Sequence, residues 1–306
     1  MNNHIKCMDY TLAYYIEYSK LPTIAQCIED GFTKYQAEQA KHIITIKLLE
    51  QGYSNRLLEG YSNEVKHWLV LADSHYPYQN QSVMRAIFEF ALDYQPDGIL
   101  HLGDMGDFDS ITSHNNGKPR LKEGKRLVDS VNSFKQGLDL WRDFKCKKVI
   151  TFGNHENRLE RYYDVNPELE GIFDLHAICK ERGWESLPMN IPYMLGKLNC
   201  EHGLYHNLHH AKKHIEMCGV SVLYGHLHTN QVFHKSTRHS EISGTALGAT
   251  CDLNPDYMQN RPKGWCHNVA TVSVFPDGTF NLTVIDIIDG RFTYNKKVYD
   301  GNINEV

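Results

Sequence analysis

Side chains that bind metals follow several apolar runs of this sequence. The run "HWLVLAD" leads into Asp73 and His75, and the run "DGILHLGD" leads into Asp104 and Asp107. The same happens at three later places, which supply Asn154 and His155, His202, and His226 and His228. In open α/β sheets, ligands gather beyond the carboxyl ends of the strands, so we expect these side chains to converge in one crevice.

The donor types in this set favour a particular class of metal. Carboxylate oxygen and imidazole nitrogen without thiolate suit a borderline divalent cation such as Mn, Fe or Zn. Residues i and i+2 of a strand share a face, so Asp73 and His75 can both chelate, as can His226 and His228 if that segment is extended. Glycine precedes a candidate ligand where the backbone must turn tightly, at Gly103, Gly153 and Gly225.

Each motif also has an ordinary structural interpretation. In "TFGNHENRLERYY", Asn154 can simply cap the helix that follows the third apolar run. A lone Asp-x-His pair does not indicate a metal site in most chains, and neither does a lone histidine such as His202. Five such elements in order, each after an apolar run, favour a shared metal site over coincidence.

The composition describes a globular chain with a real core. The 306 residues are 41% hydrophobic and 23% charged, and the net charge is −5, so any contact with nucleic acid must come from a local patch. Eight cysteines without a C-x-x-C pair indicate reduced, mostly buried thiols. The sequence has neither an apolar run of membrane-spanning length nor a signal-peptide layout, so we expect a cytoplasmic protein without a membrane partner.

Residues 1–62 are predicted to form a helical segment apart from the domain at 63–306. Thr23 and Thr33 are suited to cap helices on either side of Gly31, which gives the outline of a helix-turn-helix. Six Lys or Arg against seven Asp or Glu is a poor balance for reading DNA, so a helical cap or an oligomerisation element is favoured.

Residues 66–306 are predicted to be a layered α/β domain. Strands at 67–73, 97–104 and 147–154 alternate with helices at 81–94 and 121–144, and the end of the chain reads as antiparallel strands with a Pro-Asp-Gly turn. One helical face is expected to be core, namely Leu127, Val131, Phe134, Leu138 and Trp141. The stretch at 207–219 is expected to be a helix whose His209, His210, Lys212, Lys213 and His214 form mainly an exposed face.

These motifs resemble the signature of the calcineurin-like metallophosphoesterase superfamily, D-x-H, G-D-x-x-D, G-N-H-[D/E], H and G-H-x-H, over residues 66 to 230. The matching elements are Asp73-Ser-His75, Gly103-Asp104-Met-Gly-Asp107, Gly153-Asn154-His155-Glu156, His202 and Gly225-His226-Leu-His228. The stretches "GNHENRLERY" and "CDLNPDYMQNRPKGW" look like the phage and prophage branch.

The resemblance implies a four-layer αββα sandwich around two divalent metal ions. It implies that Asp73, His75, Asp104 and His228 bind one ion, and that Asp104, Asn154, His202 and His226 bind the other. It also implies that His155 is the catalytic histidine and that Asp107 orients it. Mn²⁺ is the expected metal, with Fe, Zn, Ni and Mg as alternatives.

Basic residues near the motifs bear on the substrate. Arg158 and Arg161 lie one helical turn apart and could face a substrate phosphate, although both are also typical of a solvated helix. The run "GKPRLKEGKR" could follow a phosphate backbone, or it could be a solvated loop. The favoured function is hydrolysis of phosphodiester bonds in DNA, and the alternative is a phosphomonoesterase or small-nucleotide phosphodiesterase. A binding protein on an inactive fold does not fit, because every ligand type and His155 are present.

Overall fold

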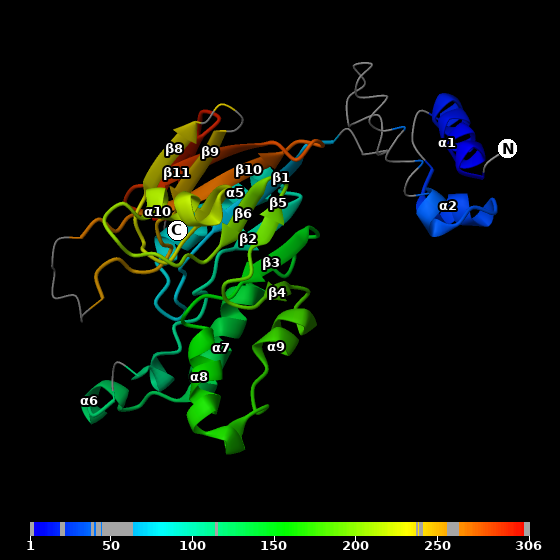
Figure 1. Ribbon diagram of the computed structural model, residues 1–306. Coiled ribbons are helices and arrows are strands. Elements are labelled where there is room, and N and C mark those ends of the chain that lie inside the picture. The colour runs from blue at the N-terminus through cyan, green and yellow to red at the C-terminus, as the bar shows by residue number, and fades with distance from the viewer. Residues whose placement is uncertain are drawn as a thin grey trace. The chain divides into compact units, whose positions relative to one another are not determined.

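The chain forms two compact units in the computed structural model. One comprises residues 1–65 and 275–278, and the other comprises residues 66–274 and 279–306. The structure describes residues 3–18, 22–37, 40, 44, 64–113, 116–236, 238, 241–255 and 263–302 (Figure 1). The predicted boundary between residues 62 and 63 lies outside these ranges.

The N-terminal unit begins with helices α1 (Asn3–Tyr18) and α2 (Ile24–Glu29). Thr23 caps α2 through a capping box, in which its Oγ1 accepts from the backbone N–H of Gln26 at 3.1 Å. Thr33 makes the same exchange with Gln36. Both predicted caps are therefore confirmed. Most of the longer helix expected after Thr33 falls outside the described residues, so the helix-turn-helix stays a prediction.

The first sheet of the larger unit has six strands in the order β11-β10-β1-β2-β3-β4. The strands β1 to β4 run parallel, and β10 and β11 add antiparallel at one edge. Their bounds are β1 (Lys66–Leu71), β2 (Gly98–His101), β3 (Lys147–Thr151), β4 (Glu185–Leu187), β10 (His267–Val274) and β11 (Phe280–Ile287).

The second sheet has five strands in the order β5-β6-β7-β9-β8, with β6, β7 and β9 parallel. A separate hairpin of two strands follows at the end of the chain. The bounds are β5 (Tyr193–Leu195), β6 (Leu198–Glu201), β7 (Ser221–Tyr224), β8 (Gln231–Ser236), β9 (Glu241–Ala246), β12 (Arg291–Tyr294) and β13 (Lys297–Asp300).

Helices cover the outer faces of the two sheets, which confirms the predicted four-layer αββα sandwich (Figure 1). Alternation along β1 shows the layering: Leu69 and Leu71 pack against the helices, whereas Trp68 and Val70 pack between the sheets. The helices of this unit, whether or not they cover a sheet, are α5 (Gln81–Tyr94), α6 (Pro119–Lys122), α7 (Leu127–Asp139), α8 (Asn157–Val165), α9 (Leu175–Glu181) and α10 (His210–Cys218). Short 3₁₀ turns lie at Asp109–Ile111 and Pro167–Leu169.

Two sequence-based expectations about helices need correction. The single helix expected at 121–144 is divided into α6 and α7 around Gly124, whose φ of +74° is left-handed and interrupts the helix. The predicted core face does form, with Val131, Phe134, Leu138 and Trp141 buried and Leu127 packed against them.

The histidines of α10 differ from the exposed face that we expected. His210 and His214 are buried, while His209 and Lys212 are exposed. The His214 ring stacks on Tyr224 of β7, and its Nε2 accepts the backbone N–H of Leu204 at 3.0 Å. His214 therefore anchors the loop after His202.

All eight cysteines are free thiols, and five of them are buried. No helix within the described ranges is long and apolar enough to cross a membrane.

Candidate metal centre

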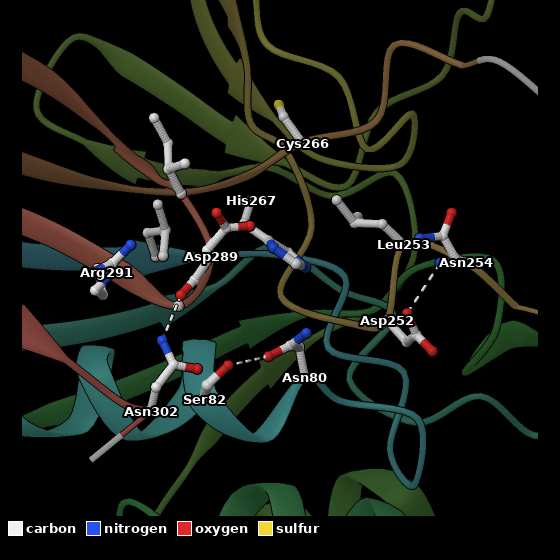
Figure 2. Close-up of a pocket in the computed structure, with 13 residues that line it drawn as sticks. Asn80, Ser82, Asp252, Leu253, Asn254, Cys266, His267, Asp289, Arg291 and Asn302 are labelled. Carbon is white, nitrogen blue, oxygen red and sulfur yellow. Dashed lines mark hydrogen bonds between the residues drawn. The ribbon is translucent and has the colours of Figure 1, made fainter.

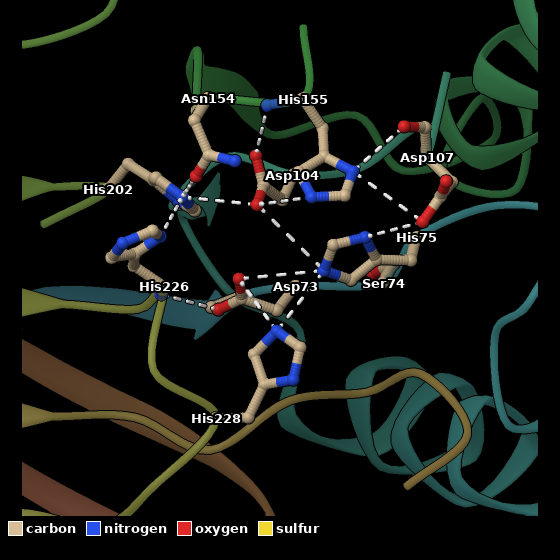
Figure 3. A network of polar contacts seen from close by, with 12 residues as sticks. Asp73, Ser74, His75, Asp104, Asp107, Asn154, His155, His202, His226 and His228 are labelled. Carbon is tan, nitrogen blue, oxygen red and sulfur yellow. Dashed lines mark hydrogen bonds and ion pairs between the residues drawn. The ribbon is translucent and has the colours of Figure 1, made fainter. Parts of the chain in front are cut away.

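Asp104 lies in the middle of the polar side chains that follow the strands (Figure 3). Its Oδ2 is 3.2 Å from Nε2 of His202, 3.7 Å from Nε2 of His155 and 3.8 Å from Nε2 of His75. The carboxylate is 2% exposed, and the backbone N–H of His155 donates to its Oδ1 at 2.8 Å. One buried carboxylate therefore faces imidazoles from three different motifs.

A first group of donors lies on one side of Asp104. Nε2 of His75 and Nε2 of His228 are 3.2 Å apart. Oδ1 of Asp73 is 3.4 Å from the His228 nitrogen and 3.8 Å from the His75 nitrogen. These atoms belong to the first and the last predicted motifs, which the fold brings together.

A second group of donors lies on the other side of Asp104. Nε2 of His202 is 3.0 Å from Oδ1 of Asn154 and 3.2 Å from Nδ1 of His226. Nδ1 of His202 is 2.8 Å from the carbonyl oxygen of Leu102, which accepts its proton, so Nε2 is the ring nitrogen that faces the group. The structure thus places all seven candidate ligands in one cluster, divided by Asp104.

The chemistry of this cluster fits divalent cations. Oδ1 of Asp73 is buried and has no hydrogen-bond partner within the described part of the chain. An isolated buried carboxylate oxygen is costly, and a cation would compensate its charge. The facing nitrogens of His75 and His228 likewise offer lone pairs to a shared centre. Separate sets of three donors lie close enough to hold an ion, among them His75, Asp104 and His155, and Asp104, His202 and His226.

The backbone at the cluster is strained. Asp73, His75, Asp104, His226 and His228 all have φ between +49° and +73°, in the left-handed region that costs non-glycine residues about 1–3 kcal/mol each. The expectation that the two i, i+2 pairs share the face of an extended strand is therefore wrong. These residues lie beyond the ends of β1 and β7, and turns rather than strand alternation direct them inward.

All three glycines before the candidate ligands make space, since a Cβ on Gly103 would lie 2.7 Å from the backbone nitrogen of Gly153. A Cβ on Gly153 would lie 2.2 Å from Oδ1 of Asp104, and one on Gly225 would lie 2.4 Å from Oδ2 of Asp73. Only Gly103 of the three has a left-handed φ, +92°. The predicted need for a tight turn holds at Gly103, whereas Gly153 and Gly225 let a carboxylate approach the backbone.

Glu156 is a residue of the cluster to which the sequence analysis gave no role. It is 1% exposed, and its two oxygens accept four backbone N–H groups at 2.8–3.1 Å, from Asp104, Met105, Gly106 and Gly153. Burial and the nearby charge of Asp104 raise the pKa of Glu156, while the four donors stabilise its carboxylate. Glu156 therefore ties the loop of Asp104 to the loop of His155. Its position in the G-N-H-E motif was the sequence feature that could have identified this role.

His155, Asp107 and Arg158 form a connected set at the edge of the cluster. Nδ1 of His155 is 2.8 Å from the carbonyl oxygen of Asp107 and 3.5 Å from its Oδ2. Arg158 donates from Nη1 to the same carbonyl at 2.6 Å, and its Nη2 is 2.9 Å from Nε2 of His155. Nδ1 of His75 is 3.2 Å from Oδ2 of Asp107, which links this set to the first donor group.

The other basic residues lie farther from the cluster. Arg161 is exposed and has no hydrogen bond or ion pair among the described residues. In the basic run, Lys125 pairs with Asp109 and Lys122 donates to Asn116, while Arg120 and Arg126 are exposed.

The electrostatics of the cluster centre on Asp104. Burial opposes its charge, but His155 and His202 hold the pKa of Asp104 well below its usual value. Burial also disfavours a charged imidazole, yet Asp104 outweighs burial at His202 and raises its pKa to about 10. At His155 burial dominates and lowers the pKa to about 3. A neutral His155 thus lies beside a strongly acidic carboxyl group.

A cavity of about 720 Å³ lies next to the loop that carries Cys251, and none of the candidate ligands lines it. Its walls include Asn80 and Ser82 at the start of α5, Asp252, His267 and Asp289 (Figure 2). Since no candidate ligand lines this cavity, it is not the metal centre.

Comparison with known proteins identifies the matching region. Residues 67–230 match the family model described as calcineurin-like phosphoesterase. The Gene 54 protein of Mycobacterium phage L5 is 20% identical over 255 residues, in a comparison that covers 77% of this chain and 99% of that protein. Among solved structures, Vps29 of Cryptosporidium parvum is 12% identical, with a TM-score of 0.42 over 77% of this chain and 98% of that one. A structure described as a novel archaeal phosphodiesterase is 14% identical, with a TM-score of 0.37 over 71% and 99% of the two chains.

Proposed function

The chain belongs to the calcineurin-like phosphoesterase family, and from that premise we propose that it uses two divalent metal ions to hydrolyse phosphodiester bonds in DNA. The observation that carries the proposal is the position of Asp104 between two groups of donors. Its Oδ2 is 3.2 Å from His202 on one side and 3.8 Å from His75 on the other. Such a carboxylate can bridge two cations.

The donor groups define which residues would hold each ion. Asp73, His75, Asp104 and His228 would bind one, and Asp104, Asn154, His202 and His226 the other. Two bound divalent cations would supply Lewis-acid stabilisation of the negative charge on the phosphoryl oxygens. Mn²⁺ is the metal we propose, with Fe, Zn, Ni and Mg as alternatives.

His155 has the position that a general acid needs. Its Nδ1 is held by the carbonyl oxygen of Asp107, so its Nε2 points to the centre, 3.7 Å from Oδ2 of Asp104. Burial leaves the ring neutral in this structure, and Arg158 donates to its Nε2. To act as the acid, Nε2 would first take up a proton and then pass it to the leaving oxygen of a phosphodiester. Asp107 fixes the ring, and its carboxylate favours the protonated imidazole.

Arg158 would bind a phosphoryl oxygen beside His155. Its guanidinium hydrogen bonds to His155 and Asp107, so it lies at the edge of the same centre. A guanidinium there can stabilise charge on the phosphoryl group. Arg161 is exposed on the same helix and would contact a more distant phosphate of a polymer.

DNA is proposed because a basic segment follows the Asp104 motif along the chain. Residues 117–126 contain five basic residues and one acidic residue, and much of this segment is exposed. A nucleic-acid backbone is the partner that such a segment suits. The overall net charge of −5 favours the alternative, a phosphomonoesterase or small-nucleotide phosphodiesterase. The N-terminal helical segment, proposed as residues 1–62, would place the polymer if it is a helix-turn-helix.

The test compares four substrates with the full chain reloaded with Mn²⁺: bis-p-nitrophenyl phosphate, p-nitrophenyl phosphate, single-stranded DNA and double-stranded DNA. We expect hydrolysis of the diester and of DNA, with DNA cleavage weakening steeply as salt rises because counterions are released on binding. Hydrolysis of the monoester alone, or of small esters without DNA cleavage, would establish the alternative.

A further inference from the structure

Cys251 lies at the first donor group, for which only oxygen and nitrogen ligands were predicted. One donor atom each from His75, His228 and Cys251 lie within 4.8 Å of one another, and all three residues are buried. Neither the family motifs nor the expected oxygen and nitrogen ligand set includes this thiol.

The backbone fixes the position of Cys251 on both sides. Its N–H donates to the carbonyl oxygen of the ligand Asp73 at 3.1 Å, and Gln79 pairs with it in an antiparallel bridge. The ring of His267 lies with its Nε2 2.8 Å from the carbonyl oxygen of Cys251. Hydrogen bonds therefore hold the backbone of Cys251 beside the donor group.

An independent feature favours a cation at this place. Oδ1 of Asp73 is buried and lacks a hydrogen-bond partner within the described ranges, and it faces the nitrogens of His75 and His228 at 3.8 and 3.4 Å (Figure 3). A buried carboxylate oxygen needs a positive partner. The same two imidazoles lie close to Cys251.

We infer that Sγ of Cys251 is a further ligand of the ion held by Asp73, His75 and His228, and that it makes this subsite prefer Zn²⁺ or Fe²⁺ over Mn²⁺. The inference rests on the proposed two-metal function. In a tetrahedral zinc site, Zn–S and Zn–N bonds of about 2.3 and 2.1 Å place the two ligand atoms about 3.6 Å apart. Donor atoms that lie within 4.8 Å of one another therefore need to approach by at most about 1 Å. Small side-chain rotations therefore suffice.

The thiolate gives the two subsites different metal preferences. Thiolate ligands select softer metals, whereas carboxylate and carbonyl oxygens suit Mn²⁺. Within the described residues, two other sets of three donors lie close together and contain no sulfur. They are Asp104, His202 and His226, and His75, Asp104 and His155. On binding, the thiol of Cys251 loses its proton to solvent, as coordinating thiols do.

X-ray absorption at the zinc edge, on the full chain reloaded with Zn²⁺, tests the inference directly. We expect a sulfur neighbour at about 2.3 Å in the wild-type protein, on the order of one per two zinc ions. It should persist in Cys266→Ser and be lost in Cys251→Ser. Cys266 is the matched control because it is a half-buried thiol outside the donor groups.

The outcomes separate the inference from the proposed function. Bound zinc with only nitrogen and oxygen neighbours in the wild-type protein would overturn the role of Cys251 and leave the two-metal centre standing. Failure to bind zinc at all would overturn both.

Competition between metals gives a second readout. After dialysis against equal Zn²⁺ and Mn²⁺, Cys251→Ser should show a ratio of bound zinc to manganese lower than wild type by on the order of tenfold, since removing a soft ligand weakens zinc more than manganese. An unchanged ratio would contradict the preference that we assign to the thiolate.

Discussion

Replacing Glu156 by Gln tests how the centre is held in place. The side chain keeps its size, but one oxygen that accepts two backbone N–H groups becomes an NH₂ group. The carboxylate accepts from Asp104 and Gly153 through Oε2, and from Met105 and Gly106 through Oε1. Hydrogen bonds to charged groups contribute about 1.5–3 kcal/mol each, so the loss of two costs about 3–6 kcal/mol.

This cost is large compared with the total stability of a domain, which is about 5–15 kcal/mol. With a urea m-value of about 2–3 kcal/mol/M, we expect the unfolding midpoint of metal-free Glu156→Gln to fall by about 1 M or more. The metal content should fall as well, because the backbone of Asp104 loses its anchor.

The control for this variant is Glu160→Gln, which makes the same chemical change at an exposed position of α8. Its midpoint should stay close to that of the wild-type protein. If Glu156→Gln unfolded within about 0.2 M of the wild type and kept its metals, the anchoring role derived from these four hydrogen bonds would be refuted.

Three further substitutions separate the roles of the neighbouring residues. His155→Ala should keep a metal content near normal, because the backbone N–H of residue 155 still donates to Asp104. It should slow turnover about 100-fold or more. Loss of the metals would make His155 a ligand instead. Asp104→Ala should remove both ions as measured by elemental analysis, and a retained pair would exclude the bridge. Gly153→Ala should lower metal content because its Cβ would lie 2.2 Å from Oδ1 of Asp104, whereas Gly264→Ala, whose Cβ would meet its nearest neighbour at 3.5 Å, should not.

The sequence was sufficient to predict the layers and the membership of the cluster. Apolar periodicity located α5 at its observed bounds, 81–94, and the buried face of α7. The seven candidate ligands converge because the parallel strands of both sheets deliver their carboxyl ends to the same side of the sandwich, so position after a strand was enough information. The division into two donor groups came from the family resemblance.

The backbone conformation at the cluster and its long-range contacts could not be predicted from the sequence, for physical reasons. Asp73 and His75 adopt left-handed φ values that their residue types disfavour, and only tertiary contacts can stabilise them. Glu156 and Cys251 reach the centre through partners distant in sequence, such as Asp104 and Asp73. His214 of α10 was misjudged because its ring stacks on Tyr224 of a different element, which helical periodicity does not reveal.

Anomalous diffraction from crystals soaked in Mn²⁺ would show whether Asp104 bridges a pair of cations. We expect two peaks about 3.5–4 Å apart, with Asp104 between them, His75 and His228 at one peak, and His202 and His226 at the other. A single peak, or two peaks of which Asp104 contacts only one, would contradict the bridge.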